Sequence, residues 1–409
     1  MPSVQPVSFM TLAAFKEGKT LTQFLASAAV EPARAVAPTN VLSPASLPVA
    51  LTPEINTLLA LDCVVAIGVS GGKDSDACAL AVCAYLDKIG HAGPRVLIHA
   101  DLGVVEWKDS GPSCDRLAAH LGVELLTVRR QAGDMMDRWE GRWKNNVARY
   151  NDMSCMKSIL PWSTPSMRFC TSELKAAVIS SALRKRFPTQ DIVSVTGIRR
   201  QESHSRAKMP VYALDKRLTR KDAVGATWNA IIEWPIEQVF ESISDAGLRL
   251  HEAYTKYGAS RVSCAFCIMS SSKDLLAAAG CADNHDLYRR MVTLEAASTF
   301  AFQSGKWLAD AAPHLLDAEL LARVVVAKAK ASAREQAERE LPAHLLYIKG
   351  WPPVMPTPAE AELIAGVRRK VSEALGLDSI CLTGREVMAR FEDLMAQKAL
   401  KDNAKPSDA

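Results

Sequence analysis

The sequence contains no apolar segment long enough to cross a membrane. A transmembrane helix needs about 20 consecutive apolar residues, and no run in this chain approaches that length. The pattern of a secretory signal is also missing, because Phe15-Lys-Glu-Gly-Lys19 places charges where the apolar part of a signal would lie. We therefore expect a cytoplasmic protein without a membrane partner.

An excess of charge of one sign is also lacking. The 409 residues carry a net charge of only +4, which permits a phosphate-bearing partner without requiring one. Apolar residues make up 48% and charged residues 23%, which is ordinary for a folded globular protein. The ten cysteines are expected to lie in a reducing compartment, which argues against disulfides and for ligands, nucleophiles or core residues.

Three regions can be distinguished along the chain. Residues 1–53 form an N-terminal segment and a linker rich in Pro and Ala. Residues 54–305 contain the alternating pattern described next, and we expect them to form the main domain. Residues 306–409 are predicted to be helical, with one helix over 316–340 and a last helical segment over 359–398 after a Pro-rich hinge.

Short apolar runs alternate with helical patterns in the main domain. Buried parallel strands are predicted at 63–69, 95–100, 123–128 and 191–196. Helices are predicted at 74–89, 113–121 and 171–186. This alternation predicts an α/β fold, a doubly wound and mostly parallel sheet followed by a helical C-terminal region. Ligands of such sheets bind outside the carboxyl ends of the strands, so the residues that follow the strands are candidates for the site.

The first predicted strand leads directly into Ser70-Gly-Gly-Lys-Asp-Ser75. Two glycines let the backbone bend tightly and present its N–H groups to an anion. The next helix adds free N–H groups and the positive end of its dipole. Lys73 supplies a charge for phosphate, whereas Asp74 would repel a bare polyphosphate and is predicted to orient Mg²⁺. The predicted phosphate-binding residues are Ser70, Gly71, Gly72, Lys73 and Ser75.

This hexapeptide resembles the PP-loop of ATP pyrophosphatases, which split ATP into AMP and pyrophosphate. More narrowly, the chain resembles the phosphoadenosine phosphosulfate (PAPS) reductase family over roughly residues 60–300. The other matching segments are Ala100-Asp-Leu-Gly103 with Glu106-Trp107, Arg168-Phe-Cys-Thr-Ser-Glu-Leu-Lys175, Thr196-Gly-Ile-Arg-Arg-Gln-Glu-Ser203, Trp234-Pro-Ile236 and Cys264-Ala-Phe-Cys267. The resemblance implies an adenine nucleotide alpha hydrolase-like fold that binds ATP, PAPS or adenosine phosphosulfate (APS).

Two other strand ends carry candidate ligand-binding residues. The resemblance implies that Asp101 and Gly103 frame the adenosine. Gly197 would let the backbone approach the ligand, and Arg199 would stabilise charge on the α-phosphate or the acceptor. The basic stretch that follows is interpreted either as a nucleic-acid surface or as a solvated loop. It contains Lys208, Lys216, Arg217, Arg220 and Lys221.

Cys264 and Cys267 form the only Cys-x-x-Cys pair in the sequence. Two thiolates at this spacing can share one metal or cluster, but they make only half a site. The family context of Cys170 makes it the expected third ligand, with Cys155 or Cys281 as the fourth. Three interpretations remain open: a [4Fe–4S] cluster that carries sulfur, a Zn²⁺ site, or a structural cysteine pair.

Two chemistries are compatible with these residues. An ATP-dependent sulfur transferase would adenylate an acceptor and then deliver sulfur to it, with DNA or tRNA as the acceptor and a sulfur-donor protein as partner. A sulfonucleotide reductase would attack the sulfur of PAPS or APS with a cysteine and release sulfite. Lys73, and the lack of the C-terminal Cys-Gly of such reductases, favour the transferase. A nucleotide-binding defence or regulatory module without turnover is the third hypothesis. The candidate catalytic residues are Lys73, Asp74, Cys170 and Arg199.

Overall fold

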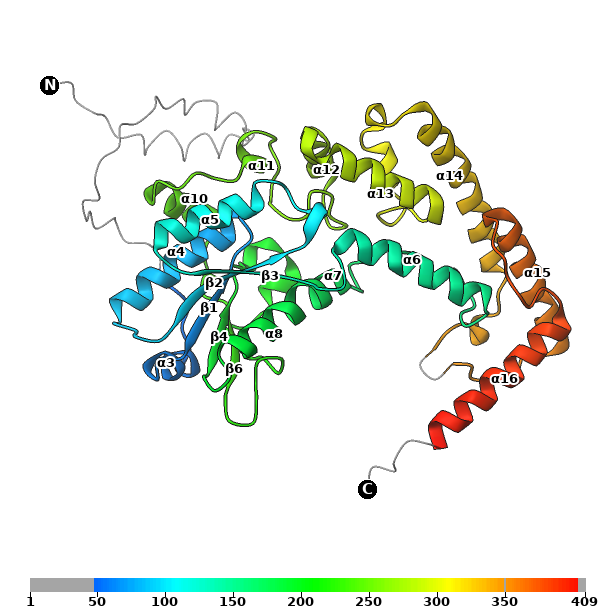
Figure 1. The fold of residues 1–409 in the computed structure, drawn as a ribbon, viewed down its shortest axis with the longest axis horizontal. Helices are drawn as coiled ribbons and strands as arrows, with labels where there is room; N and C mark the ends of the chain where they lie inside the picture. Colours follow the sequence, from blue (N-terminus) through cyan, green and yellow to red (C-terminus); the bar gives the residue numbers. More distant parts are fainter. Residues whose placement is uncertain (1–47, 349–350, 404–409) are drawn as a thin grey trace. The chain divides into compact units, whose positions relative to one another are not determined.

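The computed structural model describes residues 48–348 and 351–403, with the side chains of 401 and 403 left out (Figure 1). Most of the predicted N-terminal segment and linker therefore lies outside the described residues. The described chain divides into two compact units, each made of two segments. The first unit contains 48–134 and 169–284, and the second contains 135–168 and 285–403. Among the described residues, no helix combines the length and the apolar character that a membrane crossing requires.

The first unit is built on a six-stranded sheet with the order β3-β2-β1-β4-β6-β5. All neighbouring strands pair in parallel except β5 and β6, which are antiparallel. The strands are β1 (Val64–Gly68), β2 (Arg95–Asp101), β3 (Leu125–Arg129), β4 (Ile192–Val195), β5 (Tyr212–Leu214) and β6 (Gly225–Trp228). The four predicted strands are confirmed, and β5 and β6 are additional. The chain reverses its winding at β1, which lies between β2 and β4, so the crevice beyond its carboxyl end is the expected ligand position.

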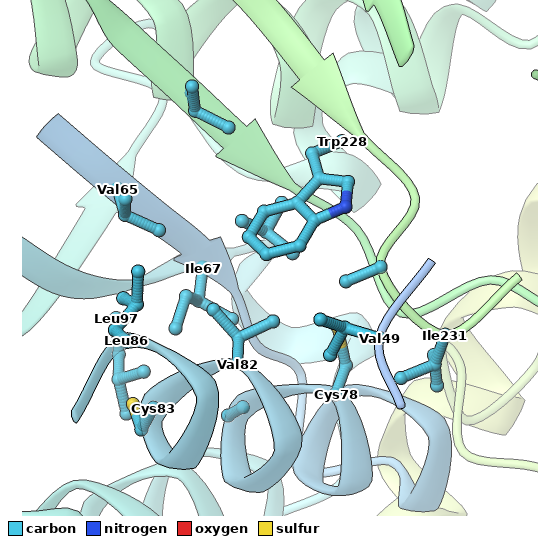
Figure 2. Packing of buried hydrophobic residues seen from close by; sticks show 14 of the residues in the cluster. Val49, Val65, Ile67, Cys78, Val82, Cys83, Leu86, Leu97, Trp228 and Ile231 are labelled. Carbon is cyan, nitrogen blue, oxygen red and sulfur yellow. The ribbon is translucent and has the colours of Figure 1, made fainter. Parts of the chain in front are cut away.

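Helices cover both faces of this sheet, which confirms the doubly wound α/β fold. Side chains of β1 alternate between two cores. Val65 and Ile67 pack with α4 (Lys73–Lys88) in one cluster (Figure 2), and Val64 and Ala66 pack with Leu183 of α8 (Ala177–Arg186) in the other. The remaining elements of this unit are α3 (Pro53–Ala60), η1 (Gly103–Val105), α5 (Ser110–Leu121), α7 (Phe169–Thr171), η2 (Ser172–Ala176), η3 (Arg200–Glu202), α9 (His204–Ala207), α10 (Ile236–Asp245), α11 (Glu252–Thr255), α12 (Ser272–Ala279) and η4 (Ala282–Asn284).

The second unit is helical, as predicted for the C-terminal region. Its elements are α6 (Met135–Asn151), α13 (His285–Ser298), η5 (Leu308–Asp310), η6 (Pro313–Leu315), α14 (Ala318–Arg339), η7 (Ala343–Leu345), α15 (Pro358–Leu375) and α16 (Gly384–Asn403). The single segment expected over 359–398 is in fact two helices, because Gly376 closes α15 with a left-handed φ of 68°. The buried guanidinium of Arg368 then holds the intervening loop through the Ile380 carbonyl.

The compact units do not follow the predicted boundary between 305 and 306. Residues 135–168 were assigned to the main domain, yet they fold with the C-terminal helices. The reason is packing: the Trp139 and Trp162 rings meet edge to face at 5.3 Å, and Trp162 meets Phe302 at 5.1 Å. The contact between Trp162 and Phe302 joins residues more than a hundred positions apart, so local patterns did not reveal it.

Candidate functional site

The loop between β1 and α4 is bent at Gly71, whose φ is +70°. A side chain would not fit there, since a Cβ would lie 3.1 Å from the Ser110 carbonyl oxygen and 3.2 Å from the His251 ring. Glycine is therefore required both by the left-handed backbone and by the close neighbours. Gly72 is the N-cap of α4, so the positive end of the helix dipole points into the loop.

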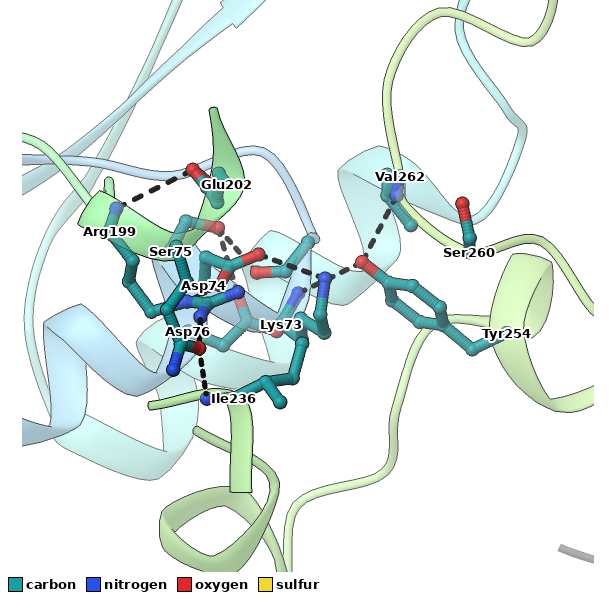
Figure 3. A network of polar contacts seen from close by, with 12 residues as sticks. Lys73, Asp74, Ser75, Asp76, Arg199, Glu202, Ile236, Tyr254, Ser260 and Val262 are labelled. Atoms are coloured by element: carbon teal, nitrogen blue, oxygen red, sulfur yellow. Dashed lines mark hydrogen bonds and ion pairs between the residues drawn. The ribbon is translucent and has the colours of Figure 1, made fainter. Parts of the chain in front are cut away.

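Asp74, in the first turn of α4, lies between two buried cations, Lys73 and Arg199 (Figure 3). Its Oδ2 lies 3.0 Å from Lys73 Nζ, and its Oδ1 lies 2.6 Å from Arg199 Nε. The exposed fractions of Lys73 and Arg199 are only 5% and 3%. Among these three side chains the two cations outnumber the one carboxylate, and in poorly hydrated surroundings they attract an anion more strongly than in water. The structure thus brings together three of the predicted catalytic residues.

Gly197 lets the end of β4 approach this loop. A Cβ at this position would lie closer than 3.0 Å to backbone atoms of Asp74 and Ser75. Backbone atoms cannot move aside as a flexible side chain would, so any larger residue would push β4 and the loop apart. Gly197 thus lies close to the backbone of the loop. Its predicted contact with a nucleotide stays a prediction.

Ser75 stabilises the loop from within. Its Oγ donates to the Gly72 carbonyl oxygen at 2.7 Å and accepts from the Ser70 amide at 3.3 Å. Ser75 thus closes the turn, and the predicted role of the Ser70 and Ser75 hydroxyls toward phosphate stays a prediction. The next acid, Asp76, was not singled out from the sequence. It is buried, and burial raises the pKa of its carboxyl to about 7 although Ser75 and Arg116 lower it.

Tyr254 is a residue of the site that sequence reasoning missed. Its hydroxyl oxygen accepts the Lys73 amide at 3.3 Å and the Val262 amide at 3.0 Å. Lys73 Nζ also lies 5.5 Å from the centre of the tyrosine ring, within range of a cation–π interaction. The tyrosine follows Lys73 by 181 positions in an ordinary helical segment, so no local signal pointed to it.

His251 is a second buried residue that was not predicted. Its Nδ1 accepts the Ala253 amide at 2.9 Å, which requires a ring nitrogen without a proton. Its Nε2 lies 3.3 Å from Ser110 Oγ. Burial lowers the pKa of His251 to about 4, while Asp109 opposes this shift. The ring is therefore neutral near pH 7 and packs against Gly71.

Asp101 and Gly103 lie at the carboxyl end of β2, as predicted. Asp101 Oδ1 accepts the Gly103 amide at 2.7 Å, and its Oδ2 accepts from Arg129 Nη2 at 2.5 Å. Gly103 has a φ of +77°, and a Cβ there would lie closer than 3.0 Å to the Asp134 carboxylate. These contacts shape a turn. A role of either residue toward adenosine stays a prediction.

His99 joins this strand to the loop. Its Nδ1 lies 3.1 Å from the Val69 carbonyl oxygen, and its Nε2 lies 3.1 Å from Glu106 Oε2. Burial by itself would lower the pKa of His99, but its hydrogen bonds with Cys114 and Glu106 raise it to about 10. A doubly protonated ring can donate to both oxygens at once. His99 thereby holds the residue that directly precedes Ser70.

A comparison with protein families agrees with this geometry. Residues 64–270, just over half of the chain, match the model of the phosphoadenosine phosphosulfate reductase domain. The chain belongs to the PAPS reductase family. The predicted resemblance is thus confirmed, and with it a PP-loop nucleotide-binding family whose members are generally enzymes. No curated protein matches the chain.

Cys170, Cys264 and Cys267 of this PAPS reductase domain lie in the first unit. Cys170 lies in α7, the short turn that leads into η2, a π-helical turn of a kind that is frequent at functional sites. Burial raises the pKa of the Cys264 thiol to about 12, with a further contribution from Cys267. Cys155, one candidate for a fourth ligand, belongs to the core of the second unit.

A metal centre is not formed by these thiols as they lie. Within 48–348 and 351–403, no three His, Cys, Asp or Glu side chains are arranged to hold a metal ion. The [4Fe–4S] or Zn²⁺ site therefore stays a prediction.

The basic stretch lies on the β5–β6 hairpin and the segment before it. Arg220 donates from Nη2 to the Gln190 carbonyl oxygen at 2.6 Å and thus stabilises the hairpin. The other four cations predicted there are exposed, namely Lys208, Lys216, Arg217 and Lys221.

Proposed function

We propose that this PAPS reductase-family chain is a PP-loop enzyme that binds Mg-ATP and adenylates an acceptor for sulfur transfer. The observation that carries the proposal is the buried Lys73–Asp74–Arg199 group at the N-terminus of α4. A buried lysine with a second cation nearby suits a triphosphate, because the β- and γ-phosphates bring several negative charges to one place.

In the proposed reaction, an acceptor oxygen attacks the α-phosphorus of ATP and the bond to pyrophosphate breaks. Lys73 and the amides of the loop would stabilise the charge of the departing pyrophosphate, and Arg199 that of the α-phosphate. Asp74 would hold Mg²⁺, which neutralises phosphate charge when it is bound; one carboxylate together with phosphate oxygens is a common magnesium site. In a second step, the outer sulfur of a persulfide attacks the activated atom of the acceptor, and AMP leaves with the acceptor oxygen. A second thiol then attacks the inner sulfur, so that the acceptor keeps the transferred sulfur and the two thiols form a disulfide.

The exposed cations of the hairpin support a polyanionic acceptor such as DNA or tRNA. Lys216, Arg217 and Lys221 are exposed in the connection between β5 and β6, where they can meet phosphates. The sulfur is proposed to come from a donor protein through Cys170, without an iron or zinc centre in the transfer.

Assays of the two half-reactions test the proposal. Purified protein is incubated with Mg-ATP alone, with DNA and with tRNA, and AMP and pyrophosphate are measured. We expect both products, in higher yield with the true acceptor. Thiol-dependent release of sulfite from PAPS or APS would instead identify a sulfonucleotide reductase. Binding of ATP without any turnover would identify a nucleotide-binding module for defence or regulation.

The cysteine chemistry has its own test. Anaerobically purified protein is analysed for iron, zinc and visible absorption, with Cys264→Ala beside it. Stoichiometric iron and a brown colour that the variant loses would restore the predicted cluster. Absence of both metals would leave Cys170, Cys264 and Cys267 as thiols only.

A further inference from the structure

The hydroxyl of Tyr254 joins two parts of the site that lie far apart in the sequence. Its oxygen accepts the amide of Lys73, which is the first N–H of α4, and the amide of Val262. The tyrosine is only 2% exposed, so these hydrogen bonds form away from water. Removing the acceptor would leave two buried N–H groups unpaired, which is costly.

The Lys73 amide belongs to the series of N–H groups that a PP-loop offers to phosphate. Within the described residues, no acceptor meets the amides of the two preceding residues, Gly71 and Gly72. The third amide in the series is occupied by the tyrosine oxygen. A phenol oxygen thus stands where a phosphate oxygen would be bound.

Val262 lies two positions before Cys264. A Cβ on Gly72 would be 3.5 Å from Val262 Cβ and 3.7 Å from Tyr254 Oη, so this segment packs directly on the loop. The chain is held independently on both sides of Val262. The Ser260 amide donates to Asp274 Oδ1 at 2.7 Å, and the Ala265 amide donates to the Val105 carbonyl oxygen at 2.8 Å. Release of the Val262 amide would therefore loosen residues 261–264 alone.

We propose that Tyr254 is a positioning residue that couples nucleotide binding to the Cys264 segment: phosphate displaces its hydroxyl from Lys73 and frees Val262. The inference rests on the proposed nucleotide binding. Because coupling is reciprocal, a change that frees Val262 must also favour the nucleotide. The tyrosine hydrogen bonds stabilise only the empty form, so their loss should tighten binding.

Tyr254→Phe tests this proposal, since it removes one oxygen and keeps the ring. Calorimetry with Mg-ATP and with pyrophosphate gives Kd, and hydrogen–deuterium exchange of peptides covering 260–264 reports on the Val262 amide. Tyr257→Phe is the matched control, because that hydroxyl meets Cys281 and Lys256 instead of the loop. Thermal unfolding verifies that all three proteins fold.

We expect either ligand to speed exchange at 260–264 in the unchanged protein. In Tyr254→Phe, exchange should be fast without ligand, and Kd should fall about fivefold, the equivalent of one net hydrogen bond. Equal Kd values and a retained response to ligand in Tyr254→Phe would overturn the proposal, as would slower exchange in the ligand-bound unchanged protein. No binding by the unchanged protein would instead overturn the proposed function, and the coupling with it.

Discussion

Arg199 Nε lies 2.6 Å from Asp74 Oδ1, and this ion pair connects the segment after β4 to the first turn of α4. The two residues are 125 positions apart in the sequence. Asp74 also holds Lys73, so removal of the arginine would leave the carboxylate with a single partner. The pair therefore contributes to the stability of the fold as well as to the charge of the site.

A double-mutant cycle of Arg199→Gln and Asp74→Asn measures this contribution. Because the arginine is buried, we expect a coupling of about 1–3 kcal/mol in the free energy of unfolding from urea denaturation. The Arg129–Asp101 pair is the control, since its arginine side chain is 60% exposed. Exposed pairs contribute about 0–1 kcal/mol, so Arg129→Gln with Asp101→Asn should show little coupling. Equal coupling in both cycles would contradict the structural assignment.

Lys73→Ala should abolish nucleotide turnover and leave the fold intact. The ammonium is expected to stabilise charge that develops on the departing phosphates, and loss of one such donor costs about 10²–10³-fold in rate. Pyrophosphate release at saturating Mg-ATP measures the effect. Lys88→Ala, at the exposed far end of the same helix, serves as the control. Full activity of the Lys73 variant would remove this residue from the mechanism.

Gly197→Ala should separate β4 from the loop. Its Cβ would meet Asp74 backbone atoms closer than 3.0 Å, and such overpacking typically costs about 1–3 kcal/mol. We expect a lower midpoint of urea denaturation and a weaker affinity for Mg-ATP. Gly111→Ala is the matched control, because a Cβ there would meet nothing within 4 Å and alanine favours the helix. A Gly197 variant as stable as the Gly111 variant would show that the contact is relieved elsewhere.

The pH dependence of stability should report on His251. In the unfolded chain its pKa is 6.5, and in the folded protein burial lowers it to about 4. The unfolded state therefore binds one more proton between these values. The stabilisation by the neutral ring is complete above pH 6.5 and is lost as the pH falls toward 4.

His251→Asn isolates this effect, since asparagine can still accept a hydrogen bond at the N-cap of α11 but does not titrate. Between pH 6.5 and 4, the slope of unfolding free energy against pH should be smaller in the variant by about 1.4 kcal/mol per pH unit. Urea denaturation at several pH values measures the slope. Parallel curves for the two proteins would refute a neutral buried His251.

Much of the fold was accessible from the sequence because it depends on neighbours in the chain. The segment that forms β1 is apolar on both faces, and Gly71 and Gly72 form the short connection from it to α4. Strand, loop and helix are each encoded within about ten residues. The family segments were recognisable for the same reason, and the family match includes them.

The short strands β5 and β6 were not predicted, because three or four residues carry too little pattern and are stabilised by the sheet they join. The fold of residues 135–168 with the C-terminal helices depends in the same way on aromatic partners such as Phe302.

The chain by itself determined that a glycine-bent loop with a lysine follows a central strand. Only the tertiary structure decided that Arg199 would neutralise Asp74, that Gly197 would have to be small, and that Tyr254 would meet the Lys73 amide. These contacts join residues more than a hundred positions apart. Their geometry follows from how the sheet and its helices pack, which no local pattern of residues records.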